Sequence, residues 1–208
     1  VLGVHDGVVP DTQPSRLLGL AHRWNHLRVC FEPVTDATGR SSDARVWVVG
    51  DAGGVEGEET ATARGALAAV TIAAELGRLT GPNAVMAPKP FVLRRRRGQA
   101  ARRFLDRLYA PTLGAAPPAD ATVVCRCEAV TAGEIRAAVR DGAGGPNRVK
   151  TFTRCGMGPC QGRLCGLTLT RLVAAATGRA PDDVGALRVR PPLKPILLGD
   201  LVGSETAA

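Results

Sequence analysis

Cysteines are the residues of this sequence with the most chemistry to offer, and five of the six lie in two short stretches. The segment TVVCRCEAV carries Cys125 and Cys127. The segment TRCGMGPCQGRLC carries Cys155, Cys160 and Cys165 among glycines and a proline. Thiolates bind soft metal ions and iron–sulfur clusters, and a reactive thiol can also do redox chemistry. The first question is therefore which of these thiols share a site.

The C-x-C pair follows two valines, which favour extended backbone. Side chains alternate along a strand, so Cys125 and Cys127 should direct both sulfurs to one side. A helix, EIRAAVRD, should follow at once, because a capping-box pattern begins at Thr131 and Gly142 is placed to end the helix. We therefore expect the pair just before a helix start.

The second helix is expected from near Gln161 to Gly178. Residues five apart on a helix point about 140° from each other, given 3.6 residues per turn. Cys160 and Cys165 can then converge only if Cys160 lies in the loop before the helix and Cys165 in its opening turns. Pro159 and the neighbouring glycines supply such a loop, whose N–H groups, with the positive helix end, would stabilise thiolates.

Composition narrows the class of protein and its setting. The 208 residues are 45% hydrophobic and 22% charged, which indicates a globular chain of one large or two small domains. We expect a cytoplasmic protein without a membrane span, because neither a long apolar run nor a secretory leader is visible. The net charge of +8 could attract nucleic acid or an acidic partner, but only 3% of residues are aromatic, which argues against nucleic acid.

Cysteines delivered as two pairs suit either a 2Fe–2S cluster or a structural zinc ion. The C-x-C spacing is short for a zinc ribbon or finger, which favours iron–sulfur. Disulfides are disfavoured in a cytoplasmic setting.

The sequence divides into four segments of different composition. Residues 1–85 alternate apolar runs and turns, with a fully apolar strand expected at Val46 to Val49 and a helix from about Glu58 to Leu79. Residues 86–120 are basic and then rich in Pro and Ala, and we interpret them as a connector. Residues 121–180 form a second compact unit. Residues 181–208 form a Pro-rich tail, expected to lie extended along a surface.

The run CRCEAVTAGEIRAAV, followed after a gap by TRCGMGPCQGRLC, resembles the bacterioferritin-associated-ferredoxin-like (BFD-like) 2Fe–2S module. That module is found at the C-terminus of several flavoprotein subunits, including the α-subunit family of opine oxidase, hydrogen cyanide synthase and D-hydroxyproline dehydrogenase. Carried over by position, the resemblance implies that the ligands are Cys125, Cys127, Cys160 and Cys165. Cys155 stands where relatives carry a non-ligand, so we interpret it as a neighbour, with a ligand or a redox-active thiol as the alternative.

The first 80 or so residues resemble the last part of the FAD domain of pyridine-nucleotide-disulfide-oxidoreductase-like flavoproteins, through GVVPDTQPSRLLGL and ARVWVVGDAGG with the helix after it. The resemblance implies cofactor binding by Gly50, Asp51, Gly53 and Gly54. A carboxylate at a strand end can accept a ribityl hydroxyl, and glycines let a cofactor approach the backbone. Taken without the resemblance, the same residues could simply be a tight turn with an aspartate near a helix start.

The fold class expected from both resemblances is α/β, with a partial FAD-binding (Rossmann-like) domain followed by a small helical BFD-like domain. No G-x-G-x-x-G occurs, and the sequence opens at Val1 without Met, so we interpret it as the later part of a flavoprotein. Whether such a piece holds FAD alone, or whether NAD(P) binds, the sequence leaves open.

The resemblance implies an oxidoreductase subunit that relays electrons through FAD and a 2Fe–2S cluster in a hetero-oligomeric amino acid, imino acid or opine dehydrogenase. Its expected partners are a subunit of the amino-acid-oxidase type and a small ferredoxin-like subunit. The alternatives are a free-standing 2Fe–2S carrier or metal-handling module, and a zinc-stabilised interaction protein. No general acid or base is apparent, so no catalytic residue is assigned.

Three other features receive simpler interpretations. His22 and His26 are four apart, as helical metal ligands can be, but no acidic residue or cysteine completes a site, so we expect surface residues. Cys30 lies in an apolar pattern and is expected to be a buried small hydrophobe. The arginine-rich run from Arg94 to Arg107 is expected to form a solvated helical face or a contact between subunits.

Overall fold

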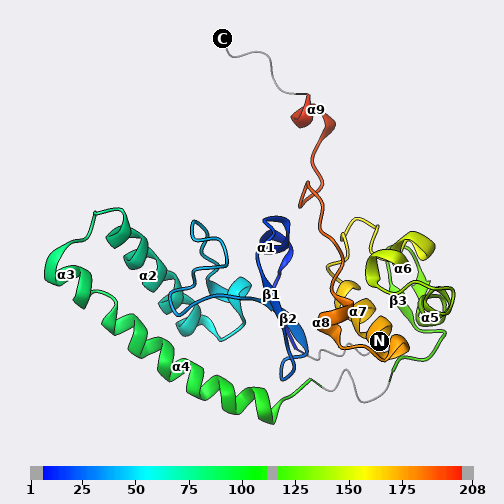
Figure 1. The fold of residues 1–208 in the computed structure, drawn as a ribbon, viewed down its shortest axis with the longest axis horizontal. Helices are drawn as coiled ribbons and strands as arrows, with labels where there is room; N and C mark the ends of the chain where they lie inside the picture. The colour runs from blue at the N-terminus through cyan, green and yellow to red at the C-terminus, as the bar shows by residue number, and fades with distance from the viewer. Residues whose placement is uncertain (1–6, 112–116, 203–208) are drawn as a thin grey trace, which may run out of the picture. The chain divides into compact units, whose positions relative to one another are not determined.

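The computed structural model describes residues 7–111 and 117–202, and the chain divides into two compact units, Val1–Pro117 and Pro118–Ala208 (Figure 1). Each unit contains a two-stranded antiparallel sheet and several helices. The expected mixed α/β class is therefore confirmed. The parallel sheet of a Rossmann-like domain is not formed by the residues described.

The first unit begins with helix α1 (Gln13–Leu17) and the hairpin β1 (His22–Asn25) and β2 (Cys30–Pro33). A 3₁₀ turn, η1 (Gly50–Gly53), leads to helix α2 (Glu58–Glu75). Acidic residues in the first turn of α2 complement its dipole, as the sequence predicts. Its end, at Glu75, comes before the predicted Leu79, because the chain turns there and reaches Gly77 with φ of 68°.

The expected strand from Val46 to Val49 is not formed. Trp47 makes only an isolated bridge to Arg40, and the Val48 N–H donates to the Gly39 carbonyl at 2.8 Å. These bonds close a local turn instead of a sheet ladder, since none of the described strands lies beside this segment. The sequence also predicts a strand that enters a turn in VLGVHDGVVP, and its first six residues lie outside the described residues.

The basic segment interpreted as a connector, residues 86–120, contains the long helix α4 (Lys89–Leu108), and the short helix α3 (Gly81–Met86) leads into it. Helix α4 packs against α2 within the first unit. The helices approach so closely that a Cβ at Gly98 of α4 would overlap the Oγ1 of Thr60 on α2. The arginines Arg94, Arg96 and Arg97 remain exposed or partly exposed on the other side, in agreement with the expected solvated face.

The second unit is built from the hairpin β3 (Val123–Cys125) and β4 (Val130–Thr131), then helix α5 (Ala132–Arg140). The capping box is confirmed, because Thr131 accepts from the backbone N–H of Glu134 and the Glu134 carboxylate accepts from that of Thr131. This local signal fixes where α5 begins.

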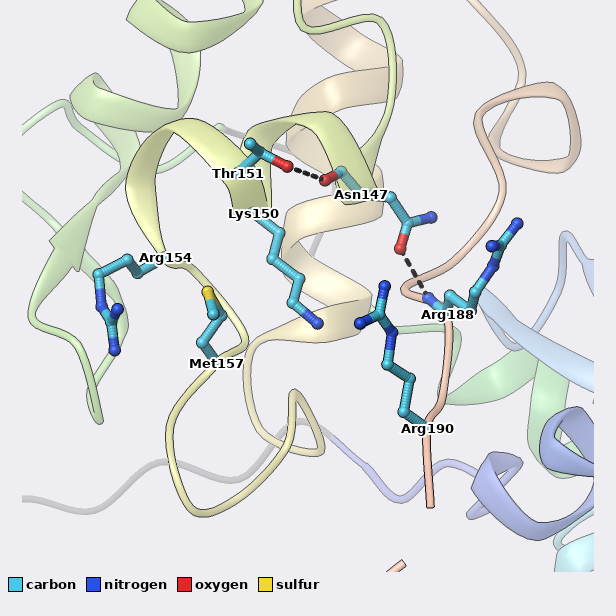
Figure 2. Close-up of a pocket in the computed structure, with 7 residues that line it drawn as sticks. All are labelled: Asn147, Lys150, Thr151, Arg154, Met157, Arg188 and Arg190. Atoms are coloured by element: carbon cyan, nitrogen blue, oxygen red, sulfur yellow. Dashed lines mark hydrogen bonds between the residues drawn. The ribbon is translucent and has the colours of Figure 1, made fainter. Parts of the chain in front are cut away.

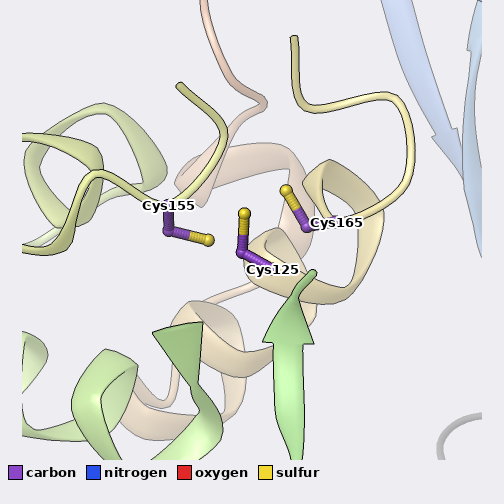
Figure 3. Close-up of side chains that lie close together, drawn as sticks. All are labelled: Cys125, Cys155 and Cys165. Carbon is purple, nitrogen blue, oxygen red and sulfur yellow. The ribbon is translucent and has the colours of Figure 1, made fainter. Parts of the chain in front are cut away.

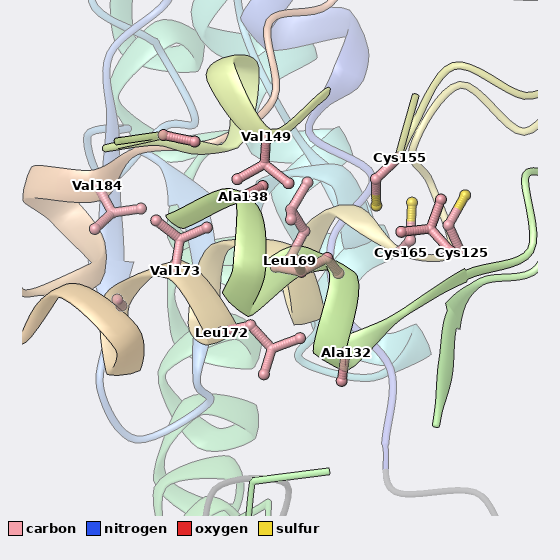
Figure 4. Close-up of a cluster of buried hydrophobic side chains, with 14 residues drawn as sticks. Cys125, Ala132, Ala138, Val149, Cys155, Cys165, Leu169, Leu172, Val173 and Val184 are labelled. Carbon is pink, nitrogen blue, oxygen red and sulfur yellow. The ribbon is translucent and has the colours of Figure 1, made fainter. Parts of the chain in front are cut away.

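Three further helices of the unit follow: α6 (Pro146–Thr153), α7 (Gly166–Thr177) and α8 (Pro181–Val184). Helix α7 ends at Gly178, which has φ of 67°, as predicted. Fully buried side chains of α5, α6 and α7, such as Ile135, Val149 and Leu169, form the core (Figure 4). Cysteines lie at one end of this core, so helix packing positions them.

The segment predicted to lie extended from residue 181 instead begins with helix α8, then has no helix or strand until the short helix α9 (Leu198–Leu201). The loop before α7 holds it: Gln161 donates to the Pro192 carbonyl at 2.9 Å, and Arg163 donates to that of Leu193 at 2.7 Å. The segment therefore borders the cysteine-bearing loop.

Candidate functional site

Three cysteines from three different segments meet inside the second unit (Figure 3). Cys125 ends β3, Cys155 follows α6, and Cys165 is the N-cap of α7. Their sulfur atoms all lie within 4.8 Å of one another, and the side chains are at most 1% exposed. Thiolates at this separation could bind one soft metal ion or one cluster.

Cys127 and Cys160 form a second, more exposed pair. Cys127 lies in the turn between β3 and β4 and is exposed, while Cys160 is partly buried in the loop before α7. Their thiols share a hydrogen bond. Burial alone would raise the pKa of Cys160, but the N–H of Leu164, the Cys127 thiol and the N–H groups of Gly162 and Arg163 lower it overall. The expected loop of thiolate-stabilising N–H groups is thus present.

The trio and the pair interact with each other. Cys165 shares hydrogen bonds with Cys155 and Cys125, and its pKa is raised, first by the bond to Cys155 and then by burial. The charge of Cys160 also raises the pKa of Cys165. The pKa of Cys127 is raised overall: a hydrogen bond with the Cys160 backbone lowers it, but the Cys160 thiol, desolvation and the charges of Cys160 and Cys125 raise it. All four residues predicted as ligands therefore occupy one neighbourhood, with Cys155 as a fifth thiol.

The C-x-C pair is placed differently from the sequence expectation. Strand β3 ends at Cys125, and the chain turns through Cys127 to Ala129, which has φ of 55°. Because Cys127 is no longer in the strand, Cys125 is buried while Cys127 is exposed. The two thiols contribute to one neighbourhood from its inner and outer sides.

Glycine is required where the loop before α7 meets the turn after β3. A Cβ at Gly158 would overlap the Cβ of Cys127, so a larger residue could not be accommodated without displacing that turn. Gly162, with φ of 79°, would place a Cβ 2.7 Å from Leu187 Cδ1. Gly158, which the sequence predicts in the loop, thus sets the position of Cys127, and Gly162, which the sequence predicts at the start of the helix, sets the contact with Leu187.

The second candidate site is the turn Gly50–Gly53 in the first unit. Val49 is extended, Gly50 has φ of 64°, and Asp51 is exposed. A Cβ at Gly50 would meet nothing within 4 Å. Both predicted residues are therefore accessible to a ligand.

Gly53 and Gly54 serve a contact that the sequence did not reveal. The buried Arg64 of α2 donates to the Gly53 carbonyl at 3.2 Å and to that of Gly54 at 3.4 Å. A Cβ at Gly53 would overlap this guanidinium and lie 2.7 Å from the Val48 carbonyl. The open space at Gly53 is thus filled by Arg64. No local sequence signal marks Arg64, since it lies among small residues of an Ala-rich helix.

A buried ionic network supports this turn from the hairpin and α4. Arg28 donates to Glu32 at 2.9 Å and to Asp106 of α4 at 2.8 Å, and Arg102 also pairs with Asp106. Glu32 and Asp106 are 5% and 7% exposed, so both carboxylates depend on these partners. The network joins the β1–β2 hairpin to α4, two segments that are far apart in sequence.

The remaining predicted features are structural. His22 is half-buried, because its ring nitrogens bond the Ser15 hydroxyl and the Leu20 carbonyl, each at 2.8 Å. The surface interpretation of His22 is therefore wrong, and no metal group of the described residues includes it. Cys30 is 2% exposed, as expected, and burial raises its pKa to about 12.

The second unit is similar to one domain described for sarcosine oxidase. The model of the sarcosine oxidase A3 domain family matches residues 120–204. No helix in the described ranges 7–111 and 117–202 has the length and apolar composition that a membrane span requires.

Particular relatives extend this likeness over the whole chain. An opine oxidase subunit from Rhizobium meliloti (strain 1021) is 48% identical over 96% of this chain and 43% of the relative. Hydrogen cyanide synthase subunit HcnB of Pseudomonas protegens is 35% identical over 94% of this chain and 41% of the relative. The chain thus spans less than half the length of these relatives.

A solved structure shares the fold. The crystal structure of L-proline dehydrogenase from P. horikoshii matches 94% of this chain and 38% of that chain, with a TM-score of 0.71 and 23% identity. At this identity, the likeness concerns the fold alone.

Proposed function

We propose that this chain is part of an oxidoreductase subunit that holds FAD and a 2Fe–2S cluster and relays electrons between them and an acceptor. The convergence of Cys125 at the end of β3, Cys155 after α6 and Cys165 at the start of α7 carries this proposal, with the Cys127–Cys160 pair interacting with it. The relatives named as opine oxidase and hydrogen cyanide synthase subunits support it.

The proposed cluster ligands are Cys125, Cys127, Cys160 and Cys165. The donor set fits a 2Fe–2S cluster, since four thiolates are available in one neighbourhood and backbone N–H groups lower the pKa of Cys160. Bound there, a cluster would carry one electron at a time. Cys155, fully buried beside Cys125 and Cys165, would pack against the ligands rather than join them.

The proposed flavin contacts are Gly50, Asp51, Gly53 and Gly54. Accessible Asp51 fits a hydroxyl-bearing ligand, while Gly53 and Gly54 shape the turn through Arg64. The N-cap Gly57 makes no side-chain capping bond, so N–H groups at the start of α2 remain for an anionic part of the cofactor. A flavin would accept two electrons and release them singly.

The proposed substrates of the whole enzyme are amino acids, imino acids or opines, by analogy with the relatives' names. Because those relatives are subunits, we propose a partner of the amino-acid-oxidase type that oxidises substrate, together with a further, small ferredoxin-like subunit. A cytoplasmic setting belongs to the same proposal.

Anaerobic purification followed by absorption spectroscopy and iron and sulfide analysis tests the cluster. We expect charge-transfer bands and about two iron and two sulfide per chain. Cys160→Ser and Cys165→Ser should abolish these bands, and Cys155→Ser is the matched control that should keep them. A colourless protein that contains zinc would refute the cluster, and loss of the bands in Cys155→Ser would refute the ligand set.

The flavin is tested separately, in a protein that also includes the N-terminal part found in the relatives. We expect bound FAD, and Asp51→Asn should reduce its retention, while Asp43→Asn, at a different turn, should not. Cluster bands without flavin in that longer protein would favour the free-standing electron carrier.

A further inference from the structure

A cavity of about 530 Å³ lies in the second unit between α6 and the extended segment after α8 (Figure 2). It is lined by Asn147, Lys150, Thr151, Arg154, Met157, Arg188 and Arg190.

The lining comes from two segments. Asn147, Lys150 and Thr151 recur at i, i+3 and i+4 on α6, and Arg154 is the left-handed C-cap that follows them. In the segment after α8, the Arg190 side chain points toward Lys150, whereas that of Arg188 points away from it (Figure 2). Asn147 joins the two segments: its carbonyl oxygen accepts from the Arg188 N–H at 2.8 Å, and its amide donates to the Ala186 carbonyl at 3.2 Å.

The cavity is strongly positive. Four of its lining side chains are cationic and none is acidic. Arg154 is paired with Glu128 at 2.9 Å, while the side chains of Lys150, Arg188 and Arg190 have no hydrogen bond or ion pair with any described residue. An uncompensated group of cations attracts negatively charged partners over several ångströms of solvent.

The cavity shares a loop with the cysteine site. Arg154 directly precedes the buried Cys155, and Met157, two residues after Cys155, is 48% exposed. Glu128, the partner of Arg154, directly follows the exposed Cys127. One rim of the cavity therefore belongs to the same turns that present the exposed side of the cysteine site.

We infer that this cavity is a docking surface for a protein that presents a cluster of carboxylates and exchanges electrons with the cysteine site. Exposed cations around an exposed methionine match an interface with a small apolar contact and a charged rim. A small-molecule site would bury its polar groups, and a nucleic-acid site would offer aromatic side chains for stacking. The electron-exchange part rests on the proposed function, whereas the docking part does not.

Fluorescence anisotropy with a labelled hexaglutamate peptide tests the surface on the full chain. We expect binding at low ionic strength that weakens toward about 150 mM salt, because the cations are exposed. The Lys150→Glu, Arg188→Glu double variant should bind at least about tenfold more weakly. Arg140→Glu with Arg148→Glu makes the same charge change at exposed positions outside this cavity and should alter binding less than about twofold.

Equal weakening by both double variants would overturn the inference, since binding would then follow net charge alone. Pyrophosphate or a single-stranded oligonucleotide that binds more tightly than hexaglutamate at the cavity would also overturn it, in favour of a small anion or nucleic acid. The neutral pair Lys150→Gln, Arg190→Gln gives a second reading if a charge reversal disturbs folding. Cluster absorbance is read on every sample, so failure of the cluster proposal is distinct from failure of the docking surface.

Discussion

Replacing Arg64 by Met should destabilise the first unit by about 3 kcal/mol. The Arg64 guanidinium is 6% exposed and donates to the carbonyls of Gly53 and Gly54. It also lies 3.8 Å from Glu56, whose Oε2 is buried and accepts no hydrogen bond from the described residues. The substitution would therefore leave two carbonyls and one carboxylate without their cation.

The magnitude follows from these contacts. A hydrogen bond from a charged donor contributes about 1.5 to 3 kcal/mol at good geometry, and at 3.2 and 3.4 Å we take about 1 kcal/mol for each. Leaving Glu56 unpaired at 15% exposure adds about 1 kcal/mol. Arg64→Lys keeps a charge near Glu56 but only one donor head, so its cost should be about half.

Urea unfolding followed by tryptophan fluorescence is the suitable assay, because both tryptophans of the chain, Trp24 and Trp47, lie in the first unit. The control is Arg78→Met, an exposed arginine just after α2, which should change the free energy of unfolding by less than about 0.5 kcal/mol. A loss below about 1 kcal/mol for Arg64→Met, or one equal to the control, would refute the assigned role.

Three further predictions concern the first unit. Gly98→Ala should destabilise it by about 1 to 2 kcal/mol in the same assay, because the Cβ overlaps Thr60, and adding Thr60→Ala should recover part of the loss. Cys30, with a pKa raised to about 12 by burial, should resist iodoacetamide at about pH 8 in the native protein and react after unfolding, as mass spectrometry would show. Burial and then the charge of Arg16 lower the pKa of His22 from 6.5, so the unfolded state binds more protons. The free energy of unfolding should therefore fall as pH drops below 6.5. A free energy that does not change with pH, or that changes equally in His22→Asn, would contradict this.

The second unit was largely predictable because its signals are local. The capping box at Thr131 and the positive φ of Gly178 each act within one or two helical turns, and the structure confirms both. Cys165 occupies the N-cap instead of the opening turn, a small shift along the chain, because the loop from Cys160 turns on Gly162 before α7 begins.

The first unit was harder because its structure depends on distant partners. The run from Val46 to Val49 has the composition of a buried strand, but a strand also needs a neighbour, and the described residues supply none. Helix α4 was missed as a packed helix because its inner face is polar: Gln99 bonds Glu56 at 3.2 Å, and Asp106 is buried with Arg28. The spacing of apolar residues cannot show that a helix is packed when its contacts are ion pairs and polar hydrogen bonds.

The cysteines differ in burial, and this difference shows which side of the site faces solvent, which the spacing of the cysteines in the sequence could not show. Cys125 and Cys165 are each 1% exposed, whereas Cys127 is exposed and Cys160 is partly so. A cluster on the proposed ligands would therefore have one pair facing the helical core and the other facing solvent. Electron transfer is favoured where the cluster comes nearest the surface, so the outward pair defines its exit side. The Glu128–Arg154 ion pair joins that side to the positive cavity. Reversing the charges of Lys150 and Arg188 in the cavity should therefore impair docking without removing a cluster ligand.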